Sequence, residues 1–309
     1  MTNKIIAIQG NHPKELNSIS DTSIFLANEA QNKKYKIFYY EPKNLSIIND
    51  NVVAKGFFIK FNYLNKKFFK IQKKQKLNLL SCKFILIRQD PPFNLEYIST
   101  TYILDKIKNK VKIVNNPTSI RNISEKLYSS AYQKFMPKTI FTKDLREIKK
   151  FYNINKKIII KPIHGFGGNN IHLLEGPFKE KLVINFIKKN GHIMCQKFLP
   201  NIKRGDKRVF LINGKICGAI SRVPKKGSFL SNMSKGAKPI LTKLTKNEKK
   251  ISSILAKDLL KKDIYLAGID FIDEKLNGDI NVTSPTGLKT YYDLSKINLA
   301  KIFWKGLKA

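Results

Sequence analysis

Arginine, acidic residues and cysteine are all scarce in this chain of 309 residues. The chain has 59 basic and 22 acidic residues, which gives a formal net charge of +37. Only 6 of the 59 basic residues are arginine. A surface selected to bind nucleic acid would use arginine, whose planar side chain donates two hydrogen bonds at once to phosphate or guanine. Lysine, isoleucine and asparagine instead occur 53, 42 and 29 times, and all three have A/T-rich codons. We therefore interpret most of the charge as compositional drift, with nucleic-acid binding as the less favoured alternative.

The few cysteines and the lack of long apolar runs exclude two further classes of protein. Cys82, Cys195 and Cys217 are odd in number and have no C-x-x-C spacing, so buried thiols are expected rather than disulfides or zinc ligands. No apolar run approaches the roughly 20 residues that span a bilayer, and the first apolar segment is too short for a signal peptide. Since 42% of the residues are hydrophobic, folded cores are expected. We expect a soluble cytoplasmic protein with neither membrane nor nucleic acid as a partner.

The first part of the chain alternates strand and helix patterns. Asn94 is placed to cap a helix over about 95–107. Strand and helix in alternation favour a small parallel sheet of Rossmann type and an α/β class. The lysine-rich stretch 66–76 is predicted to be a solvated loop or helix face, with an RNA-binding patch as the less favoured alternative. The strands of the first part are expected at 5–8, 36–40, 84–87 and 111–114.

A second unit is expected to begin near Asn122. Asn122 and Glu125 have the spacing of a capping box, which predicts a helix over about 123–134. Further along, longer strand patterns surround a helix over about 246–260 and a Lys-, Ser- and Gly-rich loop over 224–238. The expected segments are 1–121 (Rossmann-like), 122–199 (central) and 200–309 (C-terminal).

A glycine-rich turn follows the strand pattern at 158–161. The strand delivers Lys161, and the turn contains Gly165, Gly167 and Gly168. Such a turn lets backbone N–H groups approach phosphate oxygens, while the lysine supplies a point charge. The spacing matches neither the P-loop nor the dinucleotide-binding fingerprint. A glycine-rich hairpin with a surface lysine is the more common explanation of this pattern alone.

Two acids and an asparagine form a second candidate cluster. Asp279 and Asn281 are two apart on an expected strand over 279–283, so their side chains face the same side. Asp270 ends an apolar strand that could pair antiparallel with it. Oxygen ligands on neighbouring strands, completed by ligand phosphates, suit Mg²⁺. The alternative is that both acids simply flank a turn at Asn277-Gly278.

The surviving arginines are the third candidate. Arg88 follows the expected strand at 84–87, at the edge where open α/β sheets bind ligands. Because the chain has so little arginine, Arg88 is a candidate for two-pronged recognition of a carboxylate or phosphate. Arg208 and Arg222 fall on expected strands of the last segment, where a salt bridge at the edge of the core is the alternative.

Together these motifs resemble the bacterial glutathione synthetases of the ATP-grasp superfamily, from about Phe84 to Thr286. The resemblance implies an ATP-grasp fold behind a Rossmann-like N-terminal domain. It also implies that ATP, with Mg²⁺ or Mn²⁺, drives the joining of γ-glutamylcysteine to glycine through an acyl phosphate, in a homo-oligomer such as a tetramer. The motifs are Arg88-x-Asp90-Pro91-Pro92-Phe93, Glu125-Lys126-Leu127, Lys161-Pro162-x-x-Gly165-x-Gly167-Gly168, Gly205-Asp206-Lys207-Arg208-Val209, Gly268-x-Asp270 and Asn281-Val282-Thr283-Ser284-Pro285.

The resemblance further implies roles for individual residues. Arg208 and Arg222 are expected to stabilise the transferred phosphoryl group. The metal ligands are expected to be Asp270, Asp279 and Asn281. The residues expected to bind ATP are Lys126, Lys161, Gly165, Gly167, Gly168, Gln196, Lys197, Phe198, Leu199 and Asp206. The residues expected to meet the substrates are Arg88, Asn281, Thr283, Ser284, Pro285, Thr286 and Gly287.

The chain departs from the family pattern at several positions. His164 stands where the family has an aspartate, and Asp279 where it has a glutamate. An Arg-Gly-Asn of the mobile substrate loop is Leu230-Ser231-Asn232, which predicts weakened or altered substrate recognition. The alternative function is therefore a related ligase with another peptide or amino acid as substrate. The lysines that could replace the lost charge are Lys225, Lys226 and Lys235.

Overall fold

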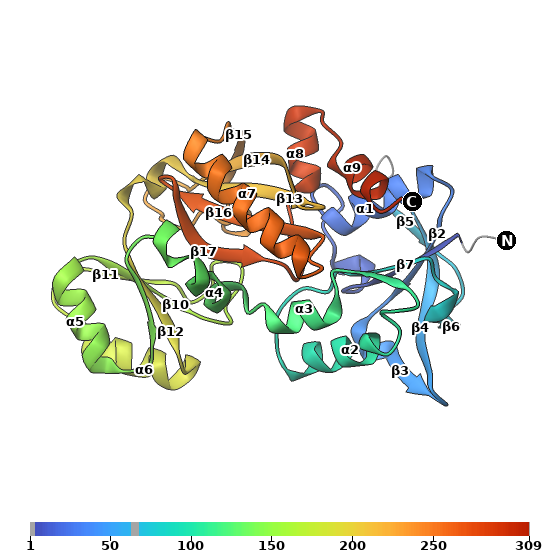
Figure 1. Cartoon of the computed structure of the whole chain (residues 1–309), viewed down its shortest axis with the longest axis horizontal. Helices are drawn as coiled ribbons and strands as arrows, with labels where there is room; N and C mark the ends of the chain where they lie inside the picture. Colours follow the sequence, from blue (N-terminus) through green and yellow to red (C-terminus); the bar gives the residue numbers. More distant parts are fainter. Residues whose placement is uncertain (1–3, 63–67, 309) are drawn as a thin grey trace.

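Three β-sheets, which follow one another along the chain, form the framework of the protein (Figure 1). The computed structural model describes residues 4–62 and 68–308. In Figure 1 the first sheet lies at the right, the second at the left, and the third between and above them. Helices cover all three sheets, so the predicted α/β class is confirmed.

The structure tests two expectations from the composition, free cysteine thiols and the lack of a membrane-spanning helix. Cys82 and Cys195 are buried, Cys217 is partly buried, and all three are free thiols, as predicted. Within 4–62 and 68–308, no helix combines the length and the apolar character that a membrane span requires.

The core of the first sheet is parallel, as the sequence predicts. Its four parallel strands lie in the order β2-β1-β7-β8, with helices on both faces. Asn94 caps α2, because its side chain accepts a 3.0 Å hydrogen bond from Tyr97 N. The elements are β1 (Ile5–Gln9), α1 (Thr22–Asn32), β2 (Lys36–Tyr40), β7 (Phe84–Ile87), α2 (Leu95–Asp105), β8 (Lys112–Val114) and α3 (Pro117–Asn122).

An antiparallel extension of this sheet was not predicted. The long strand β4 pairs with β2 on one side and carries β3, β5 and β6 as further partners. The prediction of a loop or helix face over 66–76 is therefore wrong for the part that forms β5 and the start of β6, and 66–67 lie outside the described residues. Lysines on exposed edge strands discourage pairing with other chains, which explains the composition of this stretch. The strands are β3 (Leu45–Ile48), β4 (Asn51–Phe61), β5 (Phe69–Ile71) and β6 (Gln75–Asn78).

The second sheet is antiparallel, in the order β11-β10-β12-β9, and two helices cover its outer face. Because side chains alternate along a strand, Ile158 and Ile160 pack against these helices while Ile159 and Lys161 face a cavity on the other side. The elements are β9 (Thr139–Thr142), α5 (Leu145–Asn155), β10 (Ile158–Pro162), β11 (His172–Leu174), α6 (Glu180–Asn190) and β12 (Ile193–Lys197).

The predicted capping box at Asn122 is wrong. Asn122 is the last residue of α3, and the chain leaves helical geometry at Ile123 before the short helix α4 (Glu125–Tyr128) and a 3₁₀ segment, η4 (Ser129–Phe135). Glu125 does not cap a helix, because its carboxylate accepts a 2.7 Å hydrogen bond from the Thr283 hydroxyl. The Glu125 carboxylate that a capping box would use is therefore bonded to Thr283, which is distant in the sequence.

The third sheet is antiparallel, in the order β15-β14-β13-β16-β17, with α7 on one face. Asp279 and Asn281 share one strand that pairs with the strand of Asp270, as predicted. The hairpin turns at Asp273-Glu274 rather than at Asn277-Gly278, so this strand begins and ends earlier than the expected 279–283. The elements are β13 (Asp206–Ile212), β14 (Lys215–Val223), η6 (Met233–Lys235), β15 (Lys238–Leu241), α7 (Lys246–Lys261), β16 (Leu266–Ile272) and β17 (Lys275–Asn281).

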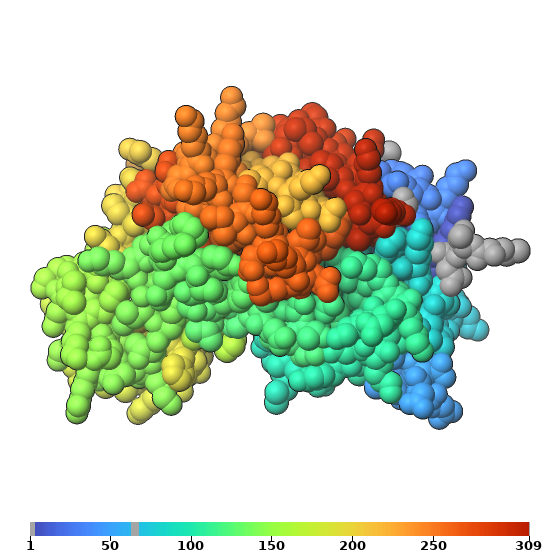
Figure 2. Space-filling view, viewed as in Figure 1, coloured from blue at the N-terminus to red at the C-terminus, as the bar shows by residue number. Residues whose placement is uncertain are grey.

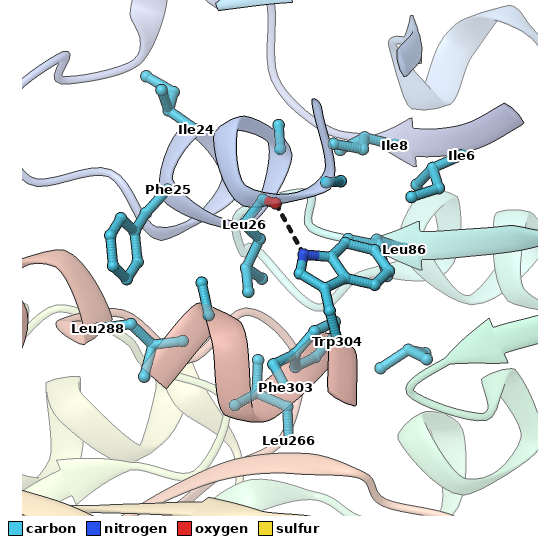
Figure 3. Packing of buried hydrophobic residues seen from close by; sticks show 14 of the residues in the cluster. Ile6, Ile8, Ile24, Phe25, Leu26, Leu86, Leu266, Leu288, Phe303 and Trp304 are labelled. Atoms are coloured by element: carbon cyan, nitrogen blue, oxygen red, sulfur yellow. Dashed lines mark hydrogen bonds between the residues drawn. The ribbon is translucent and has the colours of Figure 1, made fainter. Parts of the chain in front are cut away.

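The end of the chain packs against its beginning. Helix α8 (Leu288–Ser295) lies against α1 and against β14 and β15 of the third sheet. Helix α9 (Leu299–Gly306) packs against α1 and the first sheet, where the single tryptophan, Trp304, donates a 2.8 Å hydrogen bond to Leu26 O (Figure 3). In the space-filling view, the last residues of the chain, in red, lie beside the N-terminal segment, in blue and cyan (Figure 2). The expected segment boundaries stay predictions, but the hydrophobic core around Trp304 belongs to the first and last segments together.

Asn115 joins the first sheet to the third. Its buried amide donates to Leu266 O and Val282 O at 2.7 Å and accepts from Tyr265 N and Leu266 N at 2.9 Å. In Asn115→Asp a carboxylate oxygen would face two carbonyls, so we expect a loss of about 2–4 kcal/mol in the free energy of unfolding. Thermal or urea unfolding measures this loss.

The matched control is Asn94→Asp. The oxygen of the exposed Asn94 accepts from Tyr97 N at 3.0 Å, and an aspartate keeps that oxygen. Its stability should remain near that of the wild type. Equal stability of the two variants would contradict the role of Asn115.

Candidate active site

A cavity of about 720 Å³ lies where the three sheets meet. It is within the size range of small-molecule sites. Among the predicted site residues, only Arg88 and Phe198 are absent from its wall. The Phe198 ring instead has the Lys157 ammonium 4.8 Å above its centre. The predicted site residues between positions 126 and 287, which the sequence motifs named one by one, therefore line a single cavity, except for Phe198.

The floor of the cavity contains a buried group of two arginines and two aspartates. Strand register pairs Arg208 directly with Asp270, and Asp206 directly with Arg222. Arg208 Nη2 donates to Asp270 at 2.7 Å, Arg222 Nε donates to Asp206 at 2.7 Å, and Arg222 Nη2 also donates to Asp270 at 2.9 Å. We call these four side chains the charge quartet.

Burial and charge act against each other in the quartet. Burial opposes ionisation of Asp270, but the charges of Arg208 and Arg222 outweigh it and lower the pKa of Asp270 to about 2. Burial raises the pKa of Asp206, with Arg222 acting in the opposite direction. All four side chains are more than nine-tenths buried, and the two arginines balance the two acids. The arginines predicted to be catalytic are therefore held rigidly by charge-assisted hydrogen bonds.

Two lysines meet above the quartet. Lys161 is buried and donates to Asn277 Oδ1 at 2.9 Å and to Gln196 Oε1 at 3.2 Å. Burial lowers the pKa of Lys161, and Asp279 partly offsets that effect. Lys126 lies 3.4 Å from the Asp279 carboxylate and donates to the Gly165 carbonyl. Both predicted phosphate-binding lysines thus share one neighbour, Asp279.

The glycine-rich turn lies against the loop that precedes β15. Gly167 and Gly168 have φ of 63° and 74°, which glycine adopts without strain. A Cβ atom at Gly168 would overlap the Asn232 side chain. Because glycine has no Cβ atom, the Asn232 side chain of that loop can approach the backbone of the turn closely.

We expect Gly168→Ala to weaken ATP binding. Its positive φ and the overlap with Asn232 would shift the turn, and a strain of about 1–2 kcal/mol corresponds to roughly a tenfold rise in the KM for ATP. Steady-state kinetics measures the effect. Gly176→Ala is the matched control, since Gly176 has the same φ of 74°, open space around it and no place in the cavity wall. An equal change in both variants would contradict a specific role of Gly168.

One end of the cavity is apolar. Ile159 and Leu199 contribute to its wall beside the predicted Gln196 and Lys197. A flat heterocycle buried among branched aliphatic side chains, with polar groups at its edge, is typical of ligand sites. The remaining apolar side chains here are Ile171, Ile202 and Ile272.

Arg88 lies behind the cavity wall and holds the predicted substrate loop, residues 283–287. Its side chain donates to Ser23 Oγ and to Pro285 O, both at 3.1 Å, and is 6% exposed. Ser284 Oγ donates in turn to Arg88 O at 3.2 Å. The predicted direct contact of Arg88 with substrate stays a prediction; its structural contacts fix the loop to the first sheet.

Two acids of the cavity wall, Glu15 and Asp21, were not predicted as site residues. They contribute to the wall from the first segment, together with Asp90 of the Arg88-x-Asp90-Pro91-Pro92-Phe93 motif. Burial raises the pKa of Asp21 and of Asp90, and the charge of Arg88 acts in the opposite direction. In total seven acidic and six basic side chains line the cavity, in a chain with 59 basic and 22 acidic residues. The cavity is therefore not the positive site that the composition suggests.

The predicted metal ligands suit a hard cation. Asp270, Asp279 and Asn281 all line the cavity from neighbouring strands and present oxygen atoms. Asp270 lies at an irregularity between β16 and β17, of a kind that redirects side chains near sites. Over 4–62 and 68–308 no group of three or more acidic, histidine or cysteine side chains is suited to hold a metal. A divalent ion here would therefore need further oxygens from a bound ligand.

Family models match almost the whole chain. Residues 5–121 match the model for the N-terminal domain of prokaryotic glutathione synthetase, and residues 125–296 match the model for its ATP-grasp domain. The chain belongs to the prokaryotic glutathione synthetase family. This family is one of ATP-dependent carboxylate–amine ligases, which use ATP and divalent metal ions.

Curated relatives agree over the full length. The chain is 33% identical to a glutathione synthetase of Brucella melitensis, over 98% of both chains, and 32% identical to one of Agrobacterium fabrum, over 99% of this chain and 96% of the relative. A glutathione synthetase of Buchnera aphidicola is 34% identical over 95% of this chain and 92% of the relative.

Solved structures confirm the ATP-grasp fold. The ATP-grasp ligase PsnB has a TM-score of 0.65 at 11% identity, over 98% of this chain and 99% of that chain. D-alanyl-alanine synthetase A from Vibrio cholerae has a TM-score of 0.63 at 14% identity, over 100% of this chain and 98% of that chain. At these identities the likeness concerns the fold alone.

The departures from the glutathione synthetase pattern fall in different places. His164 is exposed and lies beside a small second hollow, outside the main cavity wall. Leu230 lines the cavity, as Asp279 does. The departures at Leu230, Ser231 and Asp279 can therefore contact a ligand in the cavity, whereas the one at His164 cannot.

Proposed function

We propose that this protein joins glycine to γ-glutamylcysteine at the expense of ATP, giving glutathione, ADP and phosphate. The observation that carries the proposal is the full-length match to the glutathione synthetase family, combined with one cavity that gathers nearly all the predicted site residues. The metal we propose is Mg²⁺. A cytoplasmic location and a homo-oligomer such as a tetramer stay predictions, as does the absence of a nucleic-acid or membrane partner.

The cavity offers a place for each part of ATP. We assign the adenine to the apolar end beside Gln196 to Leu199, and the ribose to Asp206. Since both Asp206 oxygens accept hydrogen bonds from Arg222, a ribose hydroxyl would share that carboxylate rather than take it over. We assign the phosphates to Lys126 and Lys161, beneath the glycine-rich turn.

The first chemical step is the attack of a carboxylate on a phosphate. An oxygen of the dipeptide's terminal carboxylate forms a bond to the γ-phosphorus, and the bond from that phosphorus to the bridging oxygen of ADP breaks. Both reactants are anions, so the protein must neutralise charge and align them. Arg208 and Arg222 are placed for this task, because the quartet holds their orientation before the substrates bind.

The second step consumes the acyl phosphate. The neutral amine of glycine attacks the carbonyl carbon, inorganic phosphate leaves with its bonding electron pair, and the amine loses a proton. Water would destroy the acyl phosphate in competition with glycine. The loop over 224–238 begins directly after Val223 at the end of β14 and contributes Phe229 to Lys235 to the cavity wall, so we assign to it the exclusion of water from the reacting centre.

Charge explains why a divalent metal is needed. With seven acids against six bases, the cavity wall has no excess positive charge for a polyanionic triphosphate. Asp270, Asp279 and Asn281 would hold Mg²⁺, and the bound ion would supply the missing positive charge. The side chains of the wall then bind and orient the substrates.

The test is a ligase assay with mass detection of the product. Purified protein with ATP, Mg²⁺, γ-glutamylcysteine and glycine should release phosphate and form glutathione in equal amounts, and a chelator should abolish both. Absence of product with fresh protein would overturn the proposal. Leu230 favours the second candidate, a ligase with a different amine or peptide, and a clearly better substrate in a panel would support that candidate instead.

A further inference from the structure

We propose that Lys235 binds the carboxylate of the incoming amino acid. This inference rests on the proposed function and adds a specificity-determining residue to it. Three lysines of the loop, Lys225, Lys226 and Lys235, could replace the charge that Leu230 lacks, and of these only Lys235 lines the cavity. The Lys225 side chain lies across the backbone of Gly236 instead.

The other cations of the cavity already have partners. Lys126, Lys161, Arg208 and Arg222 hold acidic or amide side chains of the wall. Among the described residues, the cavity-lining basic side chains without a hydrogen bond or ion pair are those of Lys197 and Lys235. An anionic group that enters with a substrate can therefore recruit either of them without breaking an existing ion pair.

Position separates these two lysines. Lys197 ends β12, paired with Ile158, in the sheet that forms the apolar end of the cavity. Lys235 ends the short helix η6, whose Met233 packs against the core cluster that contains Leu288 and Tyr291. Helix α8, which begins at Leu288 directly after the substrate loop at 283–287, contacts β15, and β15 begins at Lys238, just after Lys235. Lys235 thus lies on the substrate side of the cavity, and Lys197 on the nucleotide side.

Chemistry identifies the group that Lys235 would bind. The acceptor of a carboxylate–amine ligase must present a neutral amine, so its remaining charge is its own carboxylate. That carboxylate lies in a cavity with more acids than bases and needs a cationic partner. A lysine provides one flexible point charge rather than a planar fork, so it would favour a small acceptor held at a single carboxylate.

Glycine and glycinamide provide the test, because glycinamide has the amine without the carboxylate. The wild type should have a much lower KM for glycine than for glycinamide. In Lys235→Ala the KM for glycine should rise about tenfold or more, with an unchanged KM for glycinamide, ATP and γ-glutamylcysteine. Lys235→Arg should keep most of the preference for glycine.

Two further variants complete the design. Lys226→Ala, in the same loop but outside the cavity wall, should leave every KM unchanged. Lys197→Ala should not alter the KM for glycine. An unchanged KM for glycine in Lys235→Ala would overturn the inference, as would an equal rise for glycine and glycinamide. If the wild type forms no product with glycine, the proposed function fails; if it uses another amino acid, that acceptor and its amide take the place of glycine and glycinamide in the same comparison.

Discussion

We expect Lys161→Met to lose at least about a hundredfold in turnover without a loss of thermal stability. Lys161 is 3% exposed and lies between Asn277, Gln196 and Asp279 above the charge quartet. A fixed positive charge at a transferring phosphoryl group contributes on the order of 10²–10³ in rate, and methionine removes it at nearly constant volume. Steady-state kinetics measures the loss.

Thermal stability should not fall in Lys161→Met, although turnover does. Burial lowers the pKa of Lys161, which means that folding pays a desolvation cost to hold this ammonium in its charged form. Methionine removes that cost while the facing oxygens remain open to the cavity, so the melting temperature should equal or exceed that of the wild type. In many proteins a side chain that is needed for activity lowers the stability of the fold in this way.

Lys181→Met is the control for surface charge. Lys181 is exposed on α6, far from the cavity wall, and its removal should change neither turnover nor melting temperature. Near-wild-type turnover in Lys161→Met would remove Lys161 from the mechanism. A large loss of stability would show instead that Lys161 is a structural residue.

Much of the fold follows from local sequence pattern. The four parallel strands, the cap at Asn94 and the strand pair that carries Asp270 and Asp279 were all predicted, because alternation and capping are properties of neighbouring residues. The strands β3, β5 and β6 were not predicted, since among the described residues each of them pairs with β4, and this pairing depends on the tertiary fold. The same limit explains the false capping box, in which Glu125 binds Thr283 across the chain.

The candidate site was predicted in its parts but only partly in its electrostatics. Motifs named Arg208 as catalytic and Asp270 as a metal ligand, and the salt bridge considered as the alternative for Arg208 is confirmed, because strand register makes the two a buried ion pair. Arg88 was expected at the substrate because of its residue type, and it holds Pro285 from behind the cavity wall. The bulk charge of +37 predicted nothing about the cavity, whose wall has more acids than bases. Which charged side chains pair and which are buried depends on contacts between residues far apart in the sequence, so the amino-acid composition does not predict it.

Asp270→Asn should destabilise the protein strongly as well as inactivate it. The change leaves Arg208 without an anionic partner and leaves Arg222 with Asp206 alone, so two buried cations share one buried anion. Breaking a buried ion pair by neutralising one member costs about 3–5 kcal/mol. We expect a fall in melting temperature on the order of 10 °C, together with loss of ligase activity.

A double variant separates the charge effect from the chemical role. Asp270→Asn combined with Arg208→Gln restores one acid to one arginine, so most of the lost stability should return while activity does not. Calorimetry and the ligase assay measure the two quantities on the same samples. If Asp270→Asn is as stable as the wild type, the quartet does not carry the electrostatic balance that its geometry implies. If the double variant regains activity, neither Arg208 nor Asp270 is required for phosphoryl transfer.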